Sequence, residues 1–356
     1  MIESVLHAYG IPEDSLVQPL VSGLINNTWK VTHGEDAYIL QRINNHVFRE
    51  PEKLAANIRM IDEYLGQHAP GYLFVAPLAT ANSEVIVVNS DGYFRLFPFV
   101  KGSHTIDVVS SAQQAFEASL QFGKFTRLLS GFQAERLFIT IPNFHNLTLR
   151  YEQFETAIKE GNPQRVREAA GLIASIRKHV SILNDYEKIR KSDFARQRVT
   201  HHDTKISNVL FDDAGRGMCV IDLDTVMPGY FISDVGDMLR TYLSPANEEE
   251  MDFSKIEVRD EFFQAIVQGY LENMGDELTG GEKELLLYSG MFLIYMQAIR
   301  FLADYCNNDI YYGSRYEGHN FVRAGNQMDL LNKLVEKKDK LLAIVAAELK
   351  TGQVSK

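Results

Sequence analysis

The hydrophobic pattern of this chain changes near residue 100, and this change limits the folds that the chain can adopt. Residues 27–44 and 83–99 each read as strand, turn and strand, the second around an Asp-Gly turn typical of hairpins. Residues 49–65 between them repeat apolar side chains at helical spacing, and Pro51 suits a first helical turn. The opening part is therefore predicted to form a small antiparallel sheet with one helix inserted after its third strand.

The rest of the chain is mostly helical by the same criterion. Residues 147–161 and 162–186 repeat apolar side chains at helical spacing, and an Asn-Pro pair marks the start of the second stretch. Further helical patterns follow up to the C-terminus. We therefore predict an α+β fold of two unequal lobes, residues 1–100 and 101–356, with the boundary in "FVKGSHT", residues 99–105.

Charge and apolar runs limit the partners. The net charge of −11 argues against a nucleic-acid or anionic-membrane partner, because such partners require basic patches. The uncharged run from Leu285 to Ile299 is shorter than the ~20 residues that a bilayer requires, so a buried helix is predicted there. Cys219 and Cys306 are far apart in the sequence, as expected for reduced thiols, and the N-terminus lacks the pattern of a secretory signal. A cytoplasmic protein without nucleic-acid or membrane partners is predicted.

The most specific stretch is "VTHHDTKISNVLF", residues 199–211. It places Asp203 five residues before Asn208, which leads directly into a β-branched run. The next residues read as a tight hairpin whose far end carries Asp222. Because the outer ends of a tight hairpin lie together, Asn208 and Asp222 are predicted to be neighbours in space.

This arrangement suits phosphoryl transfer. A carboxylate beside an amide oxygen makes the oxygen-only site that Mg²⁺ prefers, and Asp203 is free to accept a hydrogen bond from a substrate hydroxyl. In the phosphoryl-transfer pattern a loop Asp receives the hydroxyl proton, while an Asn and a second Asp hold the metal. We therefore predict Asp203 as the base and Asn208 and Asp222 as Mg²⁺ ligands. The alternative is a structural turn in which Asp203 and Asp222 cap backbone amides.

Four polar neighbours are predicted to support this site. His201 is expected to brace the loop by bonding backbone carbonyl groups. Lys205 either reaches the γ-phosphate or is a solvated lysine. Asp224 is either a second metal contact or, as we favour, part of a salt bridge, and Asp234 is predicted to cap the helix that follows it.

The opening lobe is predicted to bind ATP. A turn between strands offers small and polar residues whose backbone amides could cover phosphates, although a plain hairpin turn is the alternative. These residues are Ser22, Gly23, Asn27 and Thr28. The backbone around Phe97 and Phe99, in the segment that links the lobes, is expected to bond adenine, unless these rings are plain core.

On these residues the chain resembles the aminoglycoside phosphotransferase and choline kinase superfamily, whose members have a protein-kinase-like fold of two lobes. More narrowly, it is similar to N-acetylhexosamine 1-kinases. The shared segments are "YILQ" (38–41), "HxDTKxxN" (201–208), "IDLDTxMPG" (221–229), "RFLADY" (300–305), "DIY" (309–311) and "HNxVR" (319–323). The resemblance implies ATP- and Mg²⁺-dependent phosphorylation of the anomeric hydroxyl of N-acetylglucosamine or N-acetylgalactosamine.

The same resemblance implies that Arg300 and Tyr311 hold the sugar together with Asp203. Arg300 is unusual in any case, because it interrupts an apolar helix, where an arginine needs a partner or a ligand. Asp304, four residues on, could be that partner. Arginine and tyrosine can hydrogen-bond a neutral sugar but suit a cationic aminoglycoside or choline poorly.

One position departs from the protein-kinase pattern. The third strand, "AYILQRIN", carries Gln41 near the place of the lysine that grips the phosphates, and Arg42 next to it points to the opposite face. Phosphate binding would then depend on the metal and on loop amides. Two other functions therefore remain open: a small-molecule kinase for an aminoglycoside, choline, homoserine or another sugar, and a nucleotide-binding pseudokinase.

Overall fold

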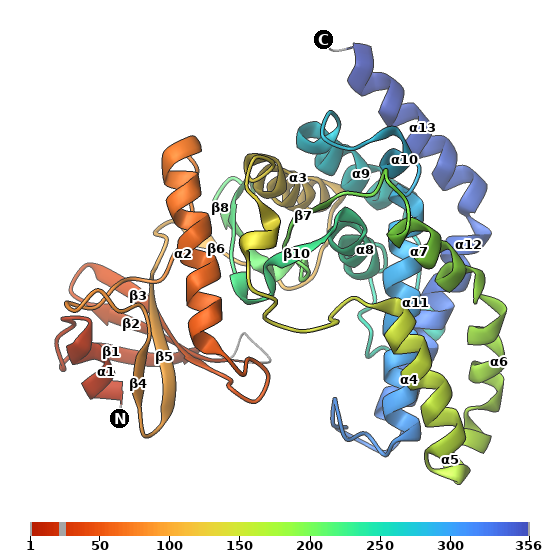
Figure 1. Ribbon diagram of the computed structural model, residues 1–356, viewed down its shortest axis with the longest axis horizontal. Helices are drawn as coiled ribbons and strands as arrows, with labels where there is room; N and C mark the ends of the chain where they lie inside the picture. The colour runs from red at the N-terminus through yellow and green to blue at the C-terminus, as the bar shows by residue number, and fades with distance from the viewer. Residues whose placement is uncertain (1, 21–25, 355–356) are drawn as a thin grey trace.

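The computed structural model describes residues 2–20 and 26–354. Ser22 and Gly23, two of the predicted phosphate-covering residues, lie outside the described residues. The chain forms a sheet lobe followed by a larger helical lobe, so the predicted α+β arrangement is confirmed (Figure 1). The exact division into residues 1–100 and 101–356 stays a prediction.

The N-terminal lobe is built on a five-stranded antiparallel sheet with the strand order β1-β2-β3-β5-β4. Helix α2 enters after the third strand, as predicted, with Pro51 in its first turn. A short N-terminal helix that the sequence pattern did not predict precedes the sheet. The elements are α1 (Ile2–Ala8), β1 (Leu16–Leu20), β2 (Asn27–His33), β3 (Asp36–Ile43), α2 (Pro51–His68), β4 (Val87–Asn89) and β5 (Gly92–Pro98).

The C-terminal lobe combines two small antiparallel sheets with a set of long helices. One sheet pairs β10 with β7, and the other has the strand order β6-β8-β9. The strands and 3₁₀ turns are β6 (Ser103–His104), η1 (Ala134–Arg136), β7 (Gln197–Thr200), η2 (Ile206–Asn208), β8 (Val209–Asp212), β9 (Gly217–Val220), η3 (Leu223–Thr225), β10 (Met227–Tyr230) and η4 (Phe253–Lys255). The helices are α3 (Ala112–Leu128), α4 (Leu147–Glu160), α5 (Pro163–Glu168), α6 (Ala170–Lys178), α7 (Ser181–Arg190), α8 (Phe231–Tyr242), α9 (Asp260–Met274), α10 (Gly280–Lys283), α11 (Leu286–Cys306), α12 (His319–Glu336) and α13 (Lys338–Val354).

The two lobes have separate hydrophobic cores. The sheet of the N-terminal lobe packs against α1 around Val31, Leu40 and Phe94. Helix α2, which stands between the sheet and the helical lobe in Figure 1, contributes Ile58 and Ile61 to the large core of the C-terminal lobe. Helix α2 is therefore shared between the lobes, while the sheet is held to the C-terminal lobe by other contacts.

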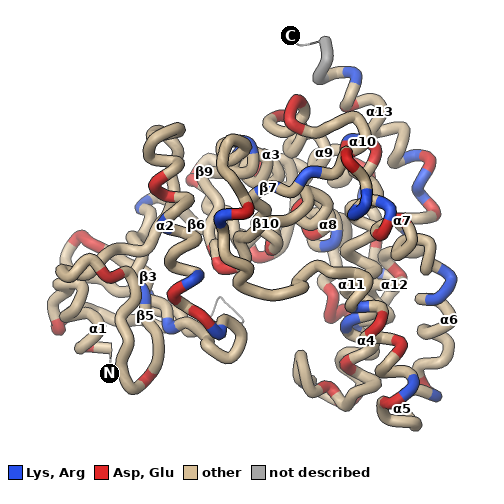
Figure 2. The backbone as a smooth tube through the Cα atoms, viewed as in Figure 1, with Lys and Arg blue, Asp and Glu red and all other residues tan. Residues whose placement is uncertain are grey.

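Helix α11 is the centre of the C-terminal lobe. It extends the predicted buried helix through Arg300 to Cys306 and packs against α4, α8 and α12. By length and composition it could cross a membrane, but 83% of its most apolar window is buried inside the protein, as in a core helix. Acidic and basic residues are interspersed through both lobes (Figure 2).

Residues 162–186 were expected to form one helix, and this prediction is wrong. The segment divides into α5, α6 and α7, which begin at Pro163, Ala170 and Ser181. Asn162 caps the first helix, since its side chain accepts hydrogen bonds from the amides of the first turn. Neither later break lies at a proline, so the apolar repeat continues across both of them and hides them.

Candidate active site

The loop that carries Asp203 is held by two carboxylates of α8. The backbone amides of His201 and His202 donate to Asp234 at 3.0 Å and 2.7 Å. The amide of Thr204 donates to Asp237 at 2.8 Å. Asp234 and Asp237 lie three residues apart on one helix face, so a single helix binds the amides on both sides of Asp203.

This geometry corrects the role predicted for Asp234. Helix α8 begins at Phe231, so Asp234 lies inside the first turn, and the N-cap residue Tyr230 makes no side-chain capping bond. The Asp234 carboxylate faces the loop of residues 201–208 instead of the end of its own helix. We call this loop the catalytic loop, after the role predicted for Asp203. Burial raises the pKa of Asp234 to about 7, although the hydrogen bonds from His201 and His202 oppose this rise.

The two histidines before Asp203 fix the loop from the inside. The His201 ring lies with Nε2 3.0 Å from the carbonyl oxygen of Ile221, a contact of the kind that a bracing role requires. His202 has a φ of 67°, and its ring Nδ1 lies 3.0 Å from the Thr200 carbonyl oxygen. Burial lowers the pKa of His202 to about 4, so the ring is neutral at neutral pH.

Gly229 makes room for the His202 ring. A Cβ atom at this position would lie 2.4 Å from Nε2 of His202, closer than side-chain carbons approach a ring nitrogen. The glycine in "IDLDTxMPG" therefore has a local reason, because only a residue without a side chain lets β10 pass the ring of the catalytic loop.

Asp203 itself is partly exposed and bonded to a neighbour. Nζ of Lys205 donates to Asp203 Oδ2 at 2.9 Å, so the lysine predicted to contact the γ-phosphate or solvent lies beside the predicted base. Burial would raise the pKa of Asp203, but the Lys205 ammonium group, His201 and the Asn208 amide lower it overall. The carboxylate is therefore ionised at neutral pH, as a hydroxyl-accepting base must be.

The hairpin that follows brings the two predicted metal ligands together. Val209 pairs with Val220 at the base of β8 and β9, and the amide of Ile221 donates to the carbonyl of Asn208 at 2.8 Å. Asp222 follows with φ 61° and ψ 61°, a left-handed conformation that Asp tolerates better than most residues. The turn ends the strand and directs the Asp222 side chain to solvent.

The donor set at this end of the hairpin fits Mg²⁺. Nδ2 of Asn208 donates to the Asp203 carbonyl at 2.9 Å, which leaves the amide oxygen available as a ligand. No described residue donates a hydrogen bond to the Asp222 carboxylate. Removal from water, followed by the nearby Asp224 carboxylate, raises the pKa of Asp222 to about 7. The described residues contain no group of three or more His, Cys, Asp or Glu that could hold a metal.

Asp224 lies in a buried salt bridge that joins the lobes. Arg95 of β5 binds both carboxylate oxygens, with Nη1–Oδ1 2.5 Å and Nη2–Oδ2 2.8 Å. Gln41, the cross-strand partner of Arg95, accepts from its Nε and Nη2 at 3.1 Å and 2.8 Å. Sequence reasoning missed Arg95, although an arginine inside the apolar strand "YFRLF" was a signal that could have identified it.

The other predicted nucleotide-binding residues lie on the sheet and in the segment that links the lobes. Thr28 Oγ1 lies 3.5 Å from Gln41 Nε2, while exposed Asn27 accepts from Arg42. Gln41 and Arg42 thus point to opposite faces of the sheet. The amide of Phe99 already donates to a carbonyl of β3, so another backbone group of this segment would have to bond adenine. The Phe97 ring packs under the Arg95 guanidinium group, and Cζ of Arg95 lies 5.0 Å from the centre of the ring.

Arg300 is not paired with Asp304. It donates to Gln297 at 3.1 Å, and its guanidinium group lies 5.4–5.9 Å from the ring centres of Phe144, Tyr311 and Tyr312. The Asp304 carboxylate accepts from the amides of Tyr311 and Tyr312 at 2.8 Å and 2.9 Å, so it fixes the turn after α11.

The rings around Arg300 connect it to the catalytic loop. Arg150 interacts electrostatically with Arg300, Tyr311 and Tyr312. We call Phe144, His145, Arg150, Arg300, Tyr311 and Tyr312 the acceptor cluster, after the role predicted for Arg300 and Tyr311. His145 stacks on Phe144 at 4.4 Å and lies 5.3 Å from the His202 ring. Sequence reasoning missed four of these residues, because they lie outside the helix of Arg300 and belong to no motif that the sequence shows. They are Phe144, His145, Arg150 and Tyr312.

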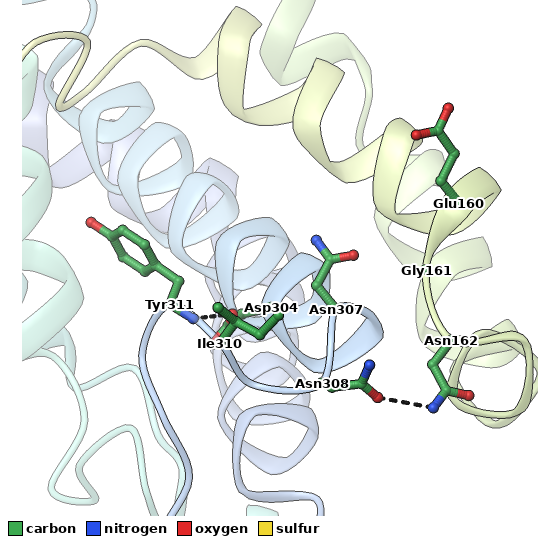
Figure 3. A pocket seen from close by; sticks show the side chains of 8 residues that line it. All are labelled: Glu160, Gly161, Asn162, Asp304, Asn307, Asn308, Ile310 and Tyr311. Atoms are coloured by element: carbon green, nitrogen blue, oxygen red, sulfur yellow. Dashed lines mark hydrogen bonds between the residues drawn. The ribbon is translucent and has the colours of Figure 1, made fainter.

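A pocket of about 400 Å³ lies where the turn after α11 meets the end of α4 (Figure 3). It is lined by Glu160, Gly161, Asn162, Asp304, Asn307, Asn308, Ile310 and Tyr311. Tyr311 is the one member shared with the acceptor cluster, and its side chain is 68% exposed. No residue of the catalytic loop lines this pocket, so it is separate from the site around Asp203.

Comparison with known proteins gives both a family and a set of similar folds. The profile of the Phosphotransferase enzyme family matches residues 16–279. A microcompartment-associated aminopropanol kinase is similar over 96% of this chain and 97% of its own, with a TM-score of 0.64 and 16% identity. Spectinomycin phosphotransferase, solved with ADP and spectinomycin, is similar over 98% and 97%, with a TM-score of 0.59 and 14% identity. Choline kinase from Cryptosporidium parvum Iowa II is similar over 98% of both chains, with a TM-score of 0.55 and 13% identity.

At such low identities these neighbours establish the fold, and the implied two-lobe kinase-like architecture is confirmed. The family match covers both lobes, from β1 to the turn before α10, and includes the catalytic loop and the hairpin after it. Given this match over more than half of its length, the chain belongs to the phosphotransferase enzyme family.

Proposed function

We propose that the protein is an ATP- and Mg²⁺-dependent kinase that phosphorylates the anomeric hydroxyl of an N-acetylhexosamine. The observation that supports phosphoryl transfer most strongly is the position of Asp203. It is a carboxylate with a lowered pKa, on a loop whose amides are bound by α8, beside a hairpin end that offers two free oxygen ligands. A protein that only bound nucleotide would need no such base.

Asp203 would orient the acceptor hydroxyl and accept its proton as the bond to the γ-phosphorus forms. Lys205 holds the carboxylate in its ionised form and limits its rotation through the 2.9 Å contact. Because the loop amides are already bound to Asp234 and Asp237, the carboxylate needs little rearrangement when the substrates arrive.

Asn208 and Asp222 would hold the Mg²⁺ ion. When bound, the ion would offset negative charge on the β- and γ-phosphates of ATP. Gln41 stands in place of a strand lysine, and Lys205 and Arg95 each already bind a carboxylate. The nucleotide phosphates would therefore depend on the metal more than they do in a protein kinase.

The acceptor cluster supports a neutral acceptor. Arg150 and Arg300 bring two positive charges to it, and burial lowers the pKa of His145 well below its usual value, so that ring is neutral. Nδ1 of His145 and Nε of Arg150 are buried without a hydrogen-bond partner among the described residues, so a ligand that reached them would find two unsatisfied polar groups.

The nearby carboxylates are engaged elsewhere. Asp304 binds backbone amides, and Glu248 binds Arg240 and Arg323. A cationic acceptor would meet Arg150 and Arg300 beside two carboxylates, Asp304 and Glu248, that already have partners. The hydroxyl and acetamido groups of a neutral sugar can accept from both arginines. Together with the sequence resemblance, this charge pattern favours N-acetylglucosamine or N-acetylgalactosamine.

A panel of acceptors tests the proposal. ADP release would be measured with N-acetylglucosamine, N-acetylgalactosamine, glucose, galactose, homoserine, choline, aminopropanol and kanamycin, and the phosphorylated position would be assigned by ³¹P NMR. We expect kcat/KM for the two N-acetylhexosamines to exceed every cationic acceptor by at least about 100-fold, with phosphate on the anomeric oxygen.

Two outcomes would contradict the proposal. A preference for choline, aminopropanol or kanamycin would assign the chain to a different acceptor class, as its structural neighbours are named for such acceptors. MgATP binding without transfer to any acceptor would instead indicate a nucleotide-binding pseudokinase.

A further inference from the structure

The contact between Arg95 and Asp224 goes beyond the roles considered so far. We propose that Arg95 is a positioning residue that holds the metal-binding end of the hairpin from the N-terminal lobe. The proposal rests on the proposed function, because it concerns how Asp222 is presented to Mg²⁺ and nucleotide. It assigns the lobe-joining cation to β5 in a chain whose β3 carries Gln41 in place of a lysine.

The first support is the geometry of the pair. Arg95 and Asp224 are 3% and 2% exposed, although they come from different lobes. The guanidinium group binds both carboxylate oxygens and, through Nε and Nη2, the Gln41 side chain. A planar fork of this kind fixes direction as well as distance, which a lysine ammonium group cannot do.

The second support is that other contacts restrain the same segment. Nδ2 of Asn26 donates to Asp224 Oδ2 at 2.9 Å, and Thr140 Oγ1 donates to the Asp224 carbonyl at 3.0 Å. Asn57 of α2 donates to the Val226 carbonyl at 3.2 Å. The residues directly after Asp222 are thus fixed by donors from the sheet, from α2 and from the segment before α4.

The third support is the cost of any other role for Arg95. To reach a phosphate, the guanidinium group would have to leave Asp224, and a buried carboxylate would lose its cation. The Arg95 guanidinium group is buried and bound to both Gln41 and Asp224, so it is suited to a fixed position. Arg95 therefore acts on the reaction through Asp224 and the left-handed turn at Asp222.

The test uses a variant pair that removes the contact without leaving a buried charge. Arg95→Met with Asp224→Asn neutralises both partners, which buried pairs usually tolerate. Folding would be checked by circular dichroism and by the fluorescence of Trp29, the single tryptophan, which lies on β2. ADP affinity would then be measured by calorimetry with Mg²⁺ and with EDTA, and kcat and KM with the acceptor.

We expect the gain in ADP affinity that Mg²⁺ provides to fall at least 10-fold in the double variant. ADP affinity in EDTA and KM for the acceptor should change less than 3-fold, while kcat falls. Arg95→Lys keeps the positive charge but not the two-point contact, and its Mg²⁺-dependent gain in ADP affinity should fall 3- to 10-fold. If the double variant does not fold, Arg95→Lys decides by itself, because no loss there would overturn the proposal.

The matched control is a second buried ion pair. Arg198 and Glu282 are 9% and 1% exposed and also form a two-point contact, but they join β7 to α10. Arg198→Met with Glu282→Gln likewise neutralises both partners and should leave the Mg²⁺-dependent gain unchanged.

Three results would overturn the proposal. An unchanged Mg²⁺-dependent gain and kcat in the double variant would make the pair a plain structural contact. Equal losses with Mg²⁺ and with EDTA would make Arg95 a direct nucleotide ligand. A wild-type protein that binds no MgADP would refute the proposed function itself, and the role of Arg95 with it.

Discussion

The catalytic loop and the sheet of the N-terminal lobe are held in place in different ways. Around Asp203, side chains of a single helix bind the backbone amides of residues 201, 202 and 204, and the Tyr242 hydroxyl donates to the Thr204 carbonyl. The sheet is held by its own ladder and by a separate small core. Its buried ionic contact with the catalytic lobe is Arg95–Asp224.

This difference shows where the chemistry is fixed. The predicted base and the hairpin with the predicted metal ligands belong to one lobe, whereas the sheet predicted to bind the nucleotide belongs to the other and meets the first through polar contacts and through helix α2. Changes in the loop should therefore affect turnover or folding strongly, whereas changes on the exposed face of the sheet should be nearly silent.

The largest effect is expected from Asp203→Asn. Loss of the base should reduce kcat by about 10³-fold, the usual range for removal of a general base. Stability should hardly change, because Lys205 is the partner lost and it is partly exposed. Turnover and thermal unfolding would be measured together, with Thr28→Ala on the sheet as the control that changes KM for ATP alone. Retention of more than a tenth of kcat would remove Asp203 from its role.

The next effect is expected from Asp234→Ala. Two buried amides would lose their acceptor, and each such loss costs about 1–3 kcal/mol, so we expect unfolding free energy to fall by about 2–5 kcal/mol. Asp212→Ala is the matched control, since its carboxylate also accepts from two amides, those of Ala214 and Arg216, but in an exposed turn. Urea unfolding that shows equal losses in the two variants would contradict the proposed rigidity of the catalytic loop.

A smaller effect is expected from pH. The pKa of Asp222 and of Asp234 is raised from 3.8 to about 7, so the folded state holds these protons more tightly than the unfolded chain. Their contribution to stability is fully present below pH 3.8 and is lost as the pH rises through about 7. We expect the ion-free protein to lose about 1–2 kcal/mol between about pH 6 and pH 8, with Asp222 contributing less because it reaches solvent.

Mg²⁺ provides the control for this effect. It requires the deprotonated Asp222, so it should raise Tm more at about pH 8 than at about pH 6. His202, with a pKa of about 4, acts oppositely, since its contribution is present above pH 6.5 and lost as the pH falls through about 4. A stability curve that rises steadily through pH 7 without metal would contradict the assignment of the two carboxyls.

The smallest effect is expected on the exposed face of the sheet. Arg42 donates to Asn27 at 2.9 Å near the surface, and such contacts contribute little. Arg42→Ala should change unfolding free energy by less than about 0.5 kcal/mol and leave KM for ATP unchanged. A clear rise in KM would indicate that Arg42, and not the opposite face with Gln41 and Arg95, serves the nucleotide.

Much of this organisation could be predicted from the sequence where spacing fixes geometry. The alternation of the first hundred residues predicts the sheet and the inserted helix, and the hairpin after Asn208 predicts that its ends meet. The position of Asp222 beside Asn208 follows from hairpin geometry, because the two residues flank the paired ends of β8 and β9. Their roles as ligands stay a prediction.

The contacts that hold the site could not be predicted, because they join residues far apart in the chain. Arg95 and Asp224 are 129 positions apart, and neither strand pattern indicates the partner. Asp234 was expected to cap its own helix, since a capping residue and a buried acceptor look alike in sequence. Arg300 pairs with Gln297 and three rings because the turn after α11 occupies Asp304.

Binding of Mn²⁺ in the presence of ADP, followed by electron paramagnetic resonance, tests the central claim most directly. It asks whether Asn208 and Asp222 form one cation site that is distinct from the base. The account predicts one Mn²⁺ per chain, bound with near wild-type affinity by Asp203→Asn and at least 10-fold more weakly by Asn208→Ala and Asp222→Asn. Equal affinity in all four proteins, or a loss confined to Asp203→Asn, would contradict it.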